Sequence, residues 1–312
     1  MKTFKINNQF YVMSFLLLFG MINTGYAQQD AQYTNYMYNT IAVNPAYAGT
    51  RDVLSIFGLH RTQWVGLDGA PVTNNFSLHT PLSNSNLGLG LSFVNDRIGP
   101  SDENTISADI SYRINMDNST LSFGLKGTAN LLNVDYTKLS IYDATDLDFQ
   151  NNVDNQFSPN IGAGVYWYTD QYYLGLSVPN FLETKHYDYN NTSSIAKERM
   201  HYYFMGGYVF DLSPSFKFKP AFLTKLVTGS PLQVDLTANF MYNDKFILGA
   251  AYRWDAAVSA LAGFQVNQKL LIGYSYDAET TKLANYNSGS HEIFLRFELF
   301  NKIEKVYSPR FF

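Results

Sequence analysis

Residues 233–242 read QVDLTANFMY, and their side chains alternate between polar and apolar from Gln233 to Phe240. The apolar members are Val234, Leu236, Ala238, Phe240 and Tyr242. Successive side chains of a β-strand point to opposite faces, so this segment is typical of a strand with one apolar and one polar face. The same alternation recurs from about residue 51 to about residue 300. The pattern therefore predicts an all-β chain.

The alternation and the turn residues between segments predict about fourteen strands. They cover residues 51–64, 72–80, 86–97, 104–115, 119–131, 156–168, 171–178, 199–211, 215–227, 231–243, 245–254, 257–265, 269–277 and 289–300. The long connections are 132–155, 179–198 and 277–288, and all of them fall at odd positions in the series. Outer-membrane barrels alternate short periplasmic turns with longer external loops in this way, and an even strand number leaves both termini periplasmic.

Ionisable and polar residues occupy the middle of the polar faces. We expect eight of them to face the lumen of a barrel: Asp109, Arg113, Lys126, Asp235, Asn239, Arg253, Arg296 and Glu298. Strands that cross a bilayer must close into a barrel, with apolar side chains outward and polar side chains inward. The sequence therefore predicts a transmembrane antiparallel β-barrel of the outer membrane, surrounded by lipid. A secreted β-sandwich with an aromatic core is the alternative that the alternation leaves open.

The chain is expected to consist of a signal peptide and one domain. Residues 1–27 have a basic start, an apolar centre at 15–19 and small residues before Gln28, which is typical of an export signal. Residues 28–50 show no alternation and form an N-terminal periplasmic segment in this interpretation. Residues 51–312 form the barrel and a C-terminal periplasmic tail.

Composition narrows the functional classes. The net charge of −4 gives no argument for a nucleic-acid partner, and the lack of cysteine excludes disulfides and cysteine-ligated metals. The 24 tyrosines and 24 phenylalanines are enough to supply the aromatic girdles of a membrane barrel. The acidic stretch 143–154 lacks the spacing of a calcium loop and is interpreted as a solvated loop rather than a calcium site. No catalytic motif is present, so we predict a protein that is not an enzyme and has no cofactor or metal.

Motifs at both ends of the mature chain resemble those of one family. These are QYxxYMxN at 32–39, NPAYAG at 44–49, RxQWxGxxGAP at 61–71, SHEI at 290–293 and SPRFF at 308–312. They are similar to the signature of the PorP/SprF family, outer-membrane proteins of the type IX secretion system in Bacteroidetes. The middle strands match this family only in their pattern.

The resemblance implies a barrel component of type IX protein secretion that helps to export or anchor a large surface adhesin, as in gliding motility. The implied partners are other type IX secretion components and a secreted adhesin as cargo. Residues expected to bind a partner, or to seal the barrel mouth, are Tyr36, Met37, Asn39, Asn44, Pro45, Tyr47, Gly49 and Trp64. The polar lumen also permits an alternative function, a passive or selective solute pore.

Overall fold

The computed structural model describes residues 31–140, 151–182 and 199–299. Strands make up most of these residues. They are β1 (Leu54–Thr62), β2 (Val72–Pro81), β3 (Leu87–Ile98), β4 (Ser101–Met116), β5 (Ser119–Val134), β6 (Val153–Tyr168), β7 (Tyr172–Val178), β8 (His201–Tyr208), β9 (Phe210–Ser213), β10 (Phe216–Val227), β11 (Gln233–Tyr242), β12 (Phe246–Arg253), β13 (Ala257–Gln265), β14 (Leu270–Glu279) and β15 (Ser290–Leu299).

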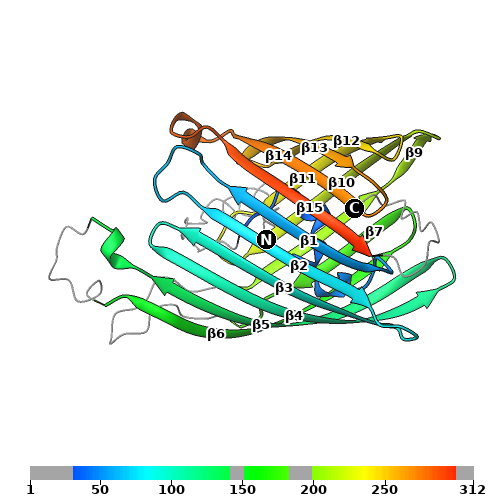
Figure 1. Cartoon of the computed structure of the whole chain (residues 1–312), viewed down its shortest axis with the longest axis horizontal. Helices are drawn as coiled ribbons and strands as arrows, with labels where there is room; N and C mark the ends of the chain where they lie inside the picture. Colours follow the sequence, from blue (N-terminus) through cyan, green and yellow to red (C-terminus); the bar gives the residue numbers. More distant parts are fainter. Residues whose placement is uncertain (1–30, 141–150, 183–198, 300–312) are drawn as a thin grey trace, which may run out of the picture.

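The strands close into one antiparallel barrel (Figure 1). Strand β15 pairs with β1, and β10 pairs with β11, so the described sheet has no break. Both β8 and β9 pair with β10 and are separated by Val209. They therefore form one interrupted strand, where the sequence predicts a continuous one at 199–211. Counted in this way, the barrel has fourteen strands, and the predicted fold class is confirmed.

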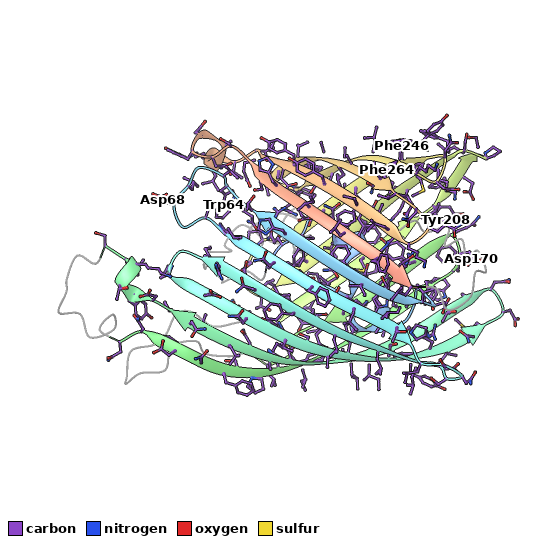
Figure 2. All side chains as sticks on the ribbon, viewed as in Figure 1. Trp64, Asp68, Asp170, Tyr208, Phe246 and Phe264 are labelled. Atoms are coloured by element: carbon purple, nitrogen blue, oxygen red, sulfur yellow. The ribbon has the colours of Figure 1, made fainter. Side chains whose placement is uncertain are left out.

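Side chains on the two faces of the barrel differ as the alternation requires. On β5, Leu125 points outward with 62% of its surface exposed, whereas the adjacent Lys126 points inward and is 6% exposed. The eight residues expected in the lumen include seven with buried side chains, and the eighth, Arg113, is half-buried. Large apolar side chains cover much of the outer surface (Figure 2).

The barrel has two different ends. At the long-loop end lie the connections 63–71 and 280–289 and the described ends of the connection between β5 and β6, residues 135–140 and 151–152. At the short-turn end lie tight turns such as 117–118 and 214–215. Figure 2 shows Trp64 and Asp68 at the long-loop end and Asp170 and Tyr208 at the opposite end.

Strands β4, β5 and β6 reach further toward the long-loop end than the sequence predicts. Leu132 pairs with both Glu103 and Gln156, inside the connection expected at 132–155. The apolar alternation is weaker there, but backbone pairing continues beyond it. The alternation of side chains therefore predicts the part of a strand that has an apolar face, but not the residue at which backbone pairing ends.

The N-terminal segment does not form a separate unit. Residues 31–50, termed the plug, lie inside the barrel as three short 3₁₀ turns at Tyr36–Tyr38, Thr40–Ala42 and Pro45–Tyr47. The plug shares one buried apolar cluster with inward residues of the barrel wall, including Phe57, Tyr166 and Phe294. The expected signal peptide and the expected C-terminal tail lie outside the described residues. No helix in the described part of the chain is long and apolar enough to span a membrane.

Candidate functional site: the plugged lumen

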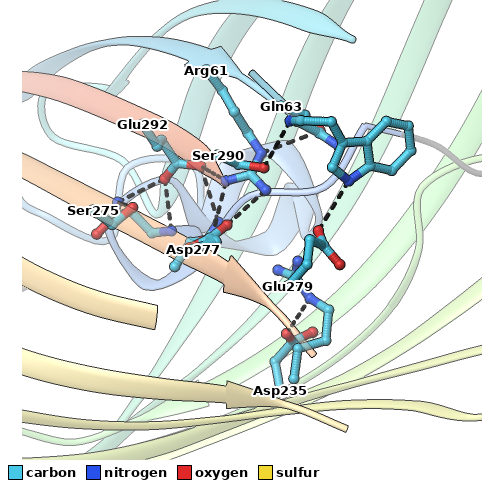
Figure 3. A network of polar contacts seen from close by, with 12 residues as sticks. Arg61, Gln63, Asp235, Ser275, Asp277, Glu279, Ser290 and Glu292 are labelled. Carbon is cyan, nitrogen blue, oxygen red and sulfur yellow. Dashed lines mark hydrogen bonds and ion pairs between the residues drawn. The ribbon is translucent and has the colours of Figure 1, made fainter. Parts of the chain in front are cut away.

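The plug begins at the long-loop end, where a buried charge cluster holds it (Figure 3). Arg61 forms ion pairs with Asp277 at 2.7 Å and with Glu292 at 3.2 Å. The backbone N–H groups of Thr34 and Asn35 donate to the Glu292 carboxylate at 3.0 and 2.8 Å. The Thr34 hydroxyl donates to Asp277 at 2.7 Å. We term these three charged residues, Arg61, Asp277 and Glu292, the clasp.

The clasp is built by the strand register. Arg61 on β1 lies directly opposite Glu292 on β15, and Asp277 comes from the neighbouring strand β14. One guanidinium faces two carboxylates, so the plug's N–H and hydroxyl donors supply the remaining hydrogen bonds. Buried ion pairs are favourable only when such additional bonds are present. The clasp and the start of the plug therefore stabilise each other.

The RxQWxGxxGAP motif forms the rim beside the clasp. The Arg61 Nε donates to the Gln63 side chain at 3.2 Å, and the Trp64 indole donates to Glu279 at 2.9 Å. The Trp64 backbone N–H donates to the Ser290 hydroxyl at 3.2 Å. Ser290 and Glu292 belong to the SHEI motif, so the N-terminal and C-terminal motifs meet at this one place.

In the middle of the lumen, polar side chains hold the plug to β2 and β5. The Asn39 side chain donates to Asn75 at 3.0 Å and accepts from the Ser77 hydroxyl at 2.9 Å. Lys126 is paired with Asp109 at 3.0 Å and donates to the Ile41 carbonyl at 3.4 Å. Lys126 and Asp109 lie directly opposite each other on neighbouring strands, so this pair of lumen charges is formed within the barrel wall.

The NPAYAG motif lies on a row of serine hydroxyls. Ser177 donates to the carbonyl of Val43, Ser122 to that of Ala46 and Ser111 to that of Ala48, each at 2.7 Å. The serines come from β7, β5 and β4, so three strands bind one stretch of plug backbone. Buried carbonyls need such donors, and here the barrel wall supplies them.

Asn44 shapes the start of this motif. Its side chain accepts from the Ala46 N–H at 3.0 Å, which caps the 3₁₀ turn that begins at Pro45, and donates to the Val165 carbonyl at 3.1 Å. The residue of the barrel wall that faces the Asn44 side chain is Gly164. A Cβ added to Gly164 would lie 2.2 Å from the Asn44 Oδ1.

The plug ends at the short-turn end in a second set of charged contacts. The Gly49 N–H donates to His79 Nδ1 at 3.1 Å, and Arg113 donates to the Gly49 carbonyl at 3.1 Å. Arg51 pairs with Glu298 at 2.5 Å. The plug therefore runs the length of the lumen, from the clasp to the start of β1.

The structure brings together most of the residues that the motifs single out. Of the eight expected partner-binding residues, all but Trp64 are buried in the lumen, and Trp64 is half-buried at the rim. Of the other lumen residues, Asp235 pairs with Arg253 at 2.6 Å, and Arg296 approaches Glu298 at 3.5 Å. Asn239 is fully buried.

Sequence reasoning did not assign a role to the clasp or to the serine row. Arg61 and Glu292 belong to motifs that the family resemblance singles out, so the sequence did mark these two residues as important. Asp277 and the three serines stand in ordinary polar phases of their strands, and only the strand register brings them to the plug.

The described residues contain no cluster of three or more His, Cys, Asp or Glu side chains arranged to hold a metal ion. Most of the acidic stretch, including Asp143, Asp146 and Asp148, lies outside the described residues. In the described part of the lumen, hydroxyl, amide and charged side chains bind the backbone of the plug.

Comparison with solved structures gives distant likenesses. Acinetobacter baumannii Omp33 has 7% identity over 80% of this chain and 99% of its own, with a TM-score of 0.46. The KdgM porin has 8% identity over 79% and 99%, with a TM-score of 0.38. The TodX deltaS2S3 mutant, a monoaromatic hydrocarbon channel, has 9% identity over 83% and 93%, with a TM-score of 0.46. Likenesses at this level carry no argument about function.

The family comparison is decisive. No curated protein matches the sequence significantly. The family described as "Type IX secretion system membrane protein PorP/SprF" matches residues 25–297, which is most of the chain. The family and the closed barrel are both typical of a non-enzymatic protein of the outer membrane. The family also makes this chain a membrane component of type IX secretion. The chain belongs to the PorP/SprF family.

Proposed function

We propose that this barrel helps to export or anchor a large surface adhesin of the gliding-motility type, in a member of the Bacteroidetes. The proposal rests on the family, whose membership makes the chain a type IX secretion component. The start of β1 and the end of β15, which both lie at the short-turn end, are proposed to be periplasmic, and the plug extends from there through the lumen to the long-loop end. Lipid, other secretion components and one adhesin are the proposed partners.

The observation that favours this proposal over a solute pore is the plug. A passive pore needs a continuous wet passage, but here the chain fills its own lumen with buried residues such as Met37, Ile41 and Ala46. The plug is held along its whole length by the clasp, by the row of Ser111, Ser122 and Ser177, and by the Arg51–Glu298 pair. A filled barrel favours a protein that works through its surfaces over one that passes solutes. The solute pore remains the alternative function.

The burial of the plug limits which of the eight expected partner-binding residues can contact another protein. Tyr36, Met37 and Tyr47 reach a partner only if the plug leaves the lumen, whereas Trp64 stands at the rim of the folded barrel. We therefore propose that the rim around Trp64 contacts secretion partners and that the seven buried residues keep this rim in place.

The test is deletion of the gene for this chain in its own organism. We expect one surface adhesin to be lost from intact cells, measured by surface biotinylation, and to be retained inside or degraded. Outer-membrane integrity, measured by vancomycin sensitivity, should not change, and the wild-type gene on a plasmid should restore display. Normal display of every large adhesin in the deletion strain would contradict the proposal.

A further inference from the structure

A cavity of about 150 Å³ lies at the long-loop end, between the plug and the inner faces of β3–β6. We term it the hollow. The plug borders it on one side with Tyr33, Ala42 and Val43. The opposite wall carries mainly hydroxyl and amide side chains: Ser92, Ser107, Thr128, Asn130, Ser158 and Asn160.

Two of these side chains have buried polar atoms with no hydrogen-bond partner among the described residues. They are the Ser92 Oγ and the Asn130 Oδ1, and each residue is 7% exposed. The amide nitrogen of Asn130 already donates to Glu103, which leaves its oxygen as the available acceptor. Buried polar atoms are almost always paired, so these two indicate a place where water or a bound molecule supplies a donor and an acceptor.

The same wall already binds a polypeptide backbone closer to the short-turn end. There the hydroxyls of Ser111 on β4 and Ser122 on β5 donate to plug carbonyls. Ser107 follows on β4 at the same inward phase, and Thr128 and Asn130 follow on β5. The chemistry that recognises a backbone therefore continues into the hollow, where the plug no longer covers the wall.

We propose that the hollow binds one or two residues of an extended polypeptide segment from another protein, which enters from the long-loop end. A backbone N–H of that segment donates to the Asn130 Oδ1, and a backbone carbonyl accepts from the Ser92 hydroxyl. The volume is large enough for such a short piece, since a single water molecule needs only about 10–15 Å³ of a cavity measured in this way. This site does not depend on the adhesin role, because a chain that displays no adhesin can still bind a peptide here.

The first experiment places the photo-reactive residue benzoylphenylalanine at Thr105, which lines the hollow, in living cells. The matched control places it at Ile106, the next residue on β4, which points outward with 52% of its surface exposed. We expect an adduct with a second polypeptide from position 105 and not from position 106. Mass spectrometry should map the adduct to one short segment of that polypeptide. A protease-resistant glycan adduct, or cross-links only within the chain itself, would overturn the proposal.

The second experiment measures binding of that mapped segment, made as a fluorescent synthetic peptide, to the purified full-length barrel. Ser92→Leu and Asn130→Leu together remove both bonding atoms and should weaken binding by about tenfold or more, since two net hydrogen bonds are lost. Asn115→Leu, on the exposed short-turn end of β4, is the control and should bind as wild type. All variants must keep the heat-dependent gel mobility of a folded barrel. Equal affinity in the double variant and wild type would refute the site.

Discussion

Gly124 on β5 lies directly against the backbone of Ala46 in the plug: a Cβ added to Gly124 would stand 2.2 Å from the Ala46 nitrogen. No real Cβ approaches a backbone atom so closely, and backbone cannot rotate away as a flexible side chain can. The NPAYAG segment can therefore approach β5 closely enough for Ser122 to bind Ala46 only because position 124 lacks a side chain.

Gly124→Ala should therefore loosen the plug. Overpacking of this kind typically destabilises by about 1–3 kcal/mol, and here the segment that can move is the plug. We expect a lower midpoint in the heat-mobility assay and faster maleimide labelling of a cysteine placed at Ala48, in a chain that has no other cysteine. Gly127→Ala on the same strand is the control, because a Cβ there meets nothing within 4 Å. Identical behaviour of the two variants would mean that the close contact has no energetic weight.

The clasp gives a prediction about charge. Arg61→Ala leaves Asp277 and Glu292 buried without their cation, and removal of one partner of a buried ion pair typically costs about 3–5 kcal/mol. Arg97→Ala is the control, since Arg97 pairs with Asp102 at 2.9 Å but is 64% exposed. Exposed pairs contribute about 0–1 kcal/mol. Urea unfolding followed by gel mobility should separate the two variants, and a loss of under 1 kcal/mol for Arg61→Ala would count against the clasp.

The strands could be predicted from the sequence because the alternation of polar and apolar side chains is contained within each strand. In β11 and β14 the two-residue period alone fixes which side chains point in. The plug could not be placed in this way. Thr34 and Asn35 bind carboxylates of residues more than 240 positions away, and nothing local to them indicates Glu292 or Asp277. The break at Val209 could not be predicted either, because the pairing register with β10 is the same on both sides of it and the alternation therefore does not mark it.

The facing of β5 can be tested with one substitution on each side. Leu125→Arg puts a charge on the outer surface and should cost about 2–4 kcal/mol if that position is near the bilayer midplane. Thr128→Arg puts the same charge beside the hollow, where water and carboxylates are near, and should cost under about 1 kcal/mol. The measurement is the yield of folded barrel in a refolding series with lipid vesicles. Equal losses at both positions would be incompatible with an outer face that contacts lipid.

Orientation in the membrane follows from the difference between the two ends. We expect the long-loop end to face the cell exterior, as longer loops do in outer-membrane barrels. A cysteine at the exposed Asn151 should react with an impermeant maleimide on intact cells. A cysteine at the exposed Asp170, at the short-turn end in Figure 2, should react only after the outer membrane is broken. The reverse labelling pattern would invert the orientation and move the hollow to the periplasmic side.

Deletion of the plug separates the plugged barrel from the solute pore. The full-length protein in a planar bilayer should give no steady single-channel current, because buried plug residues occupy the lumen. A variant without residues 31–50 exposes paired charges such as Lys126–Asp109 and Asp235–Arg253 to water along the inner wall. A polar, hydrated lumen conducts ions, so we expect stepwise currents from this variant. Gly127→Ala serves as the control for a single change that leaves the plug in place, and it should remain closed. Steady currents of equal size from the full-length protein and the deletion variant would mean that the plug does not block the lumen, and the solute pore would then become the better account of this barrel.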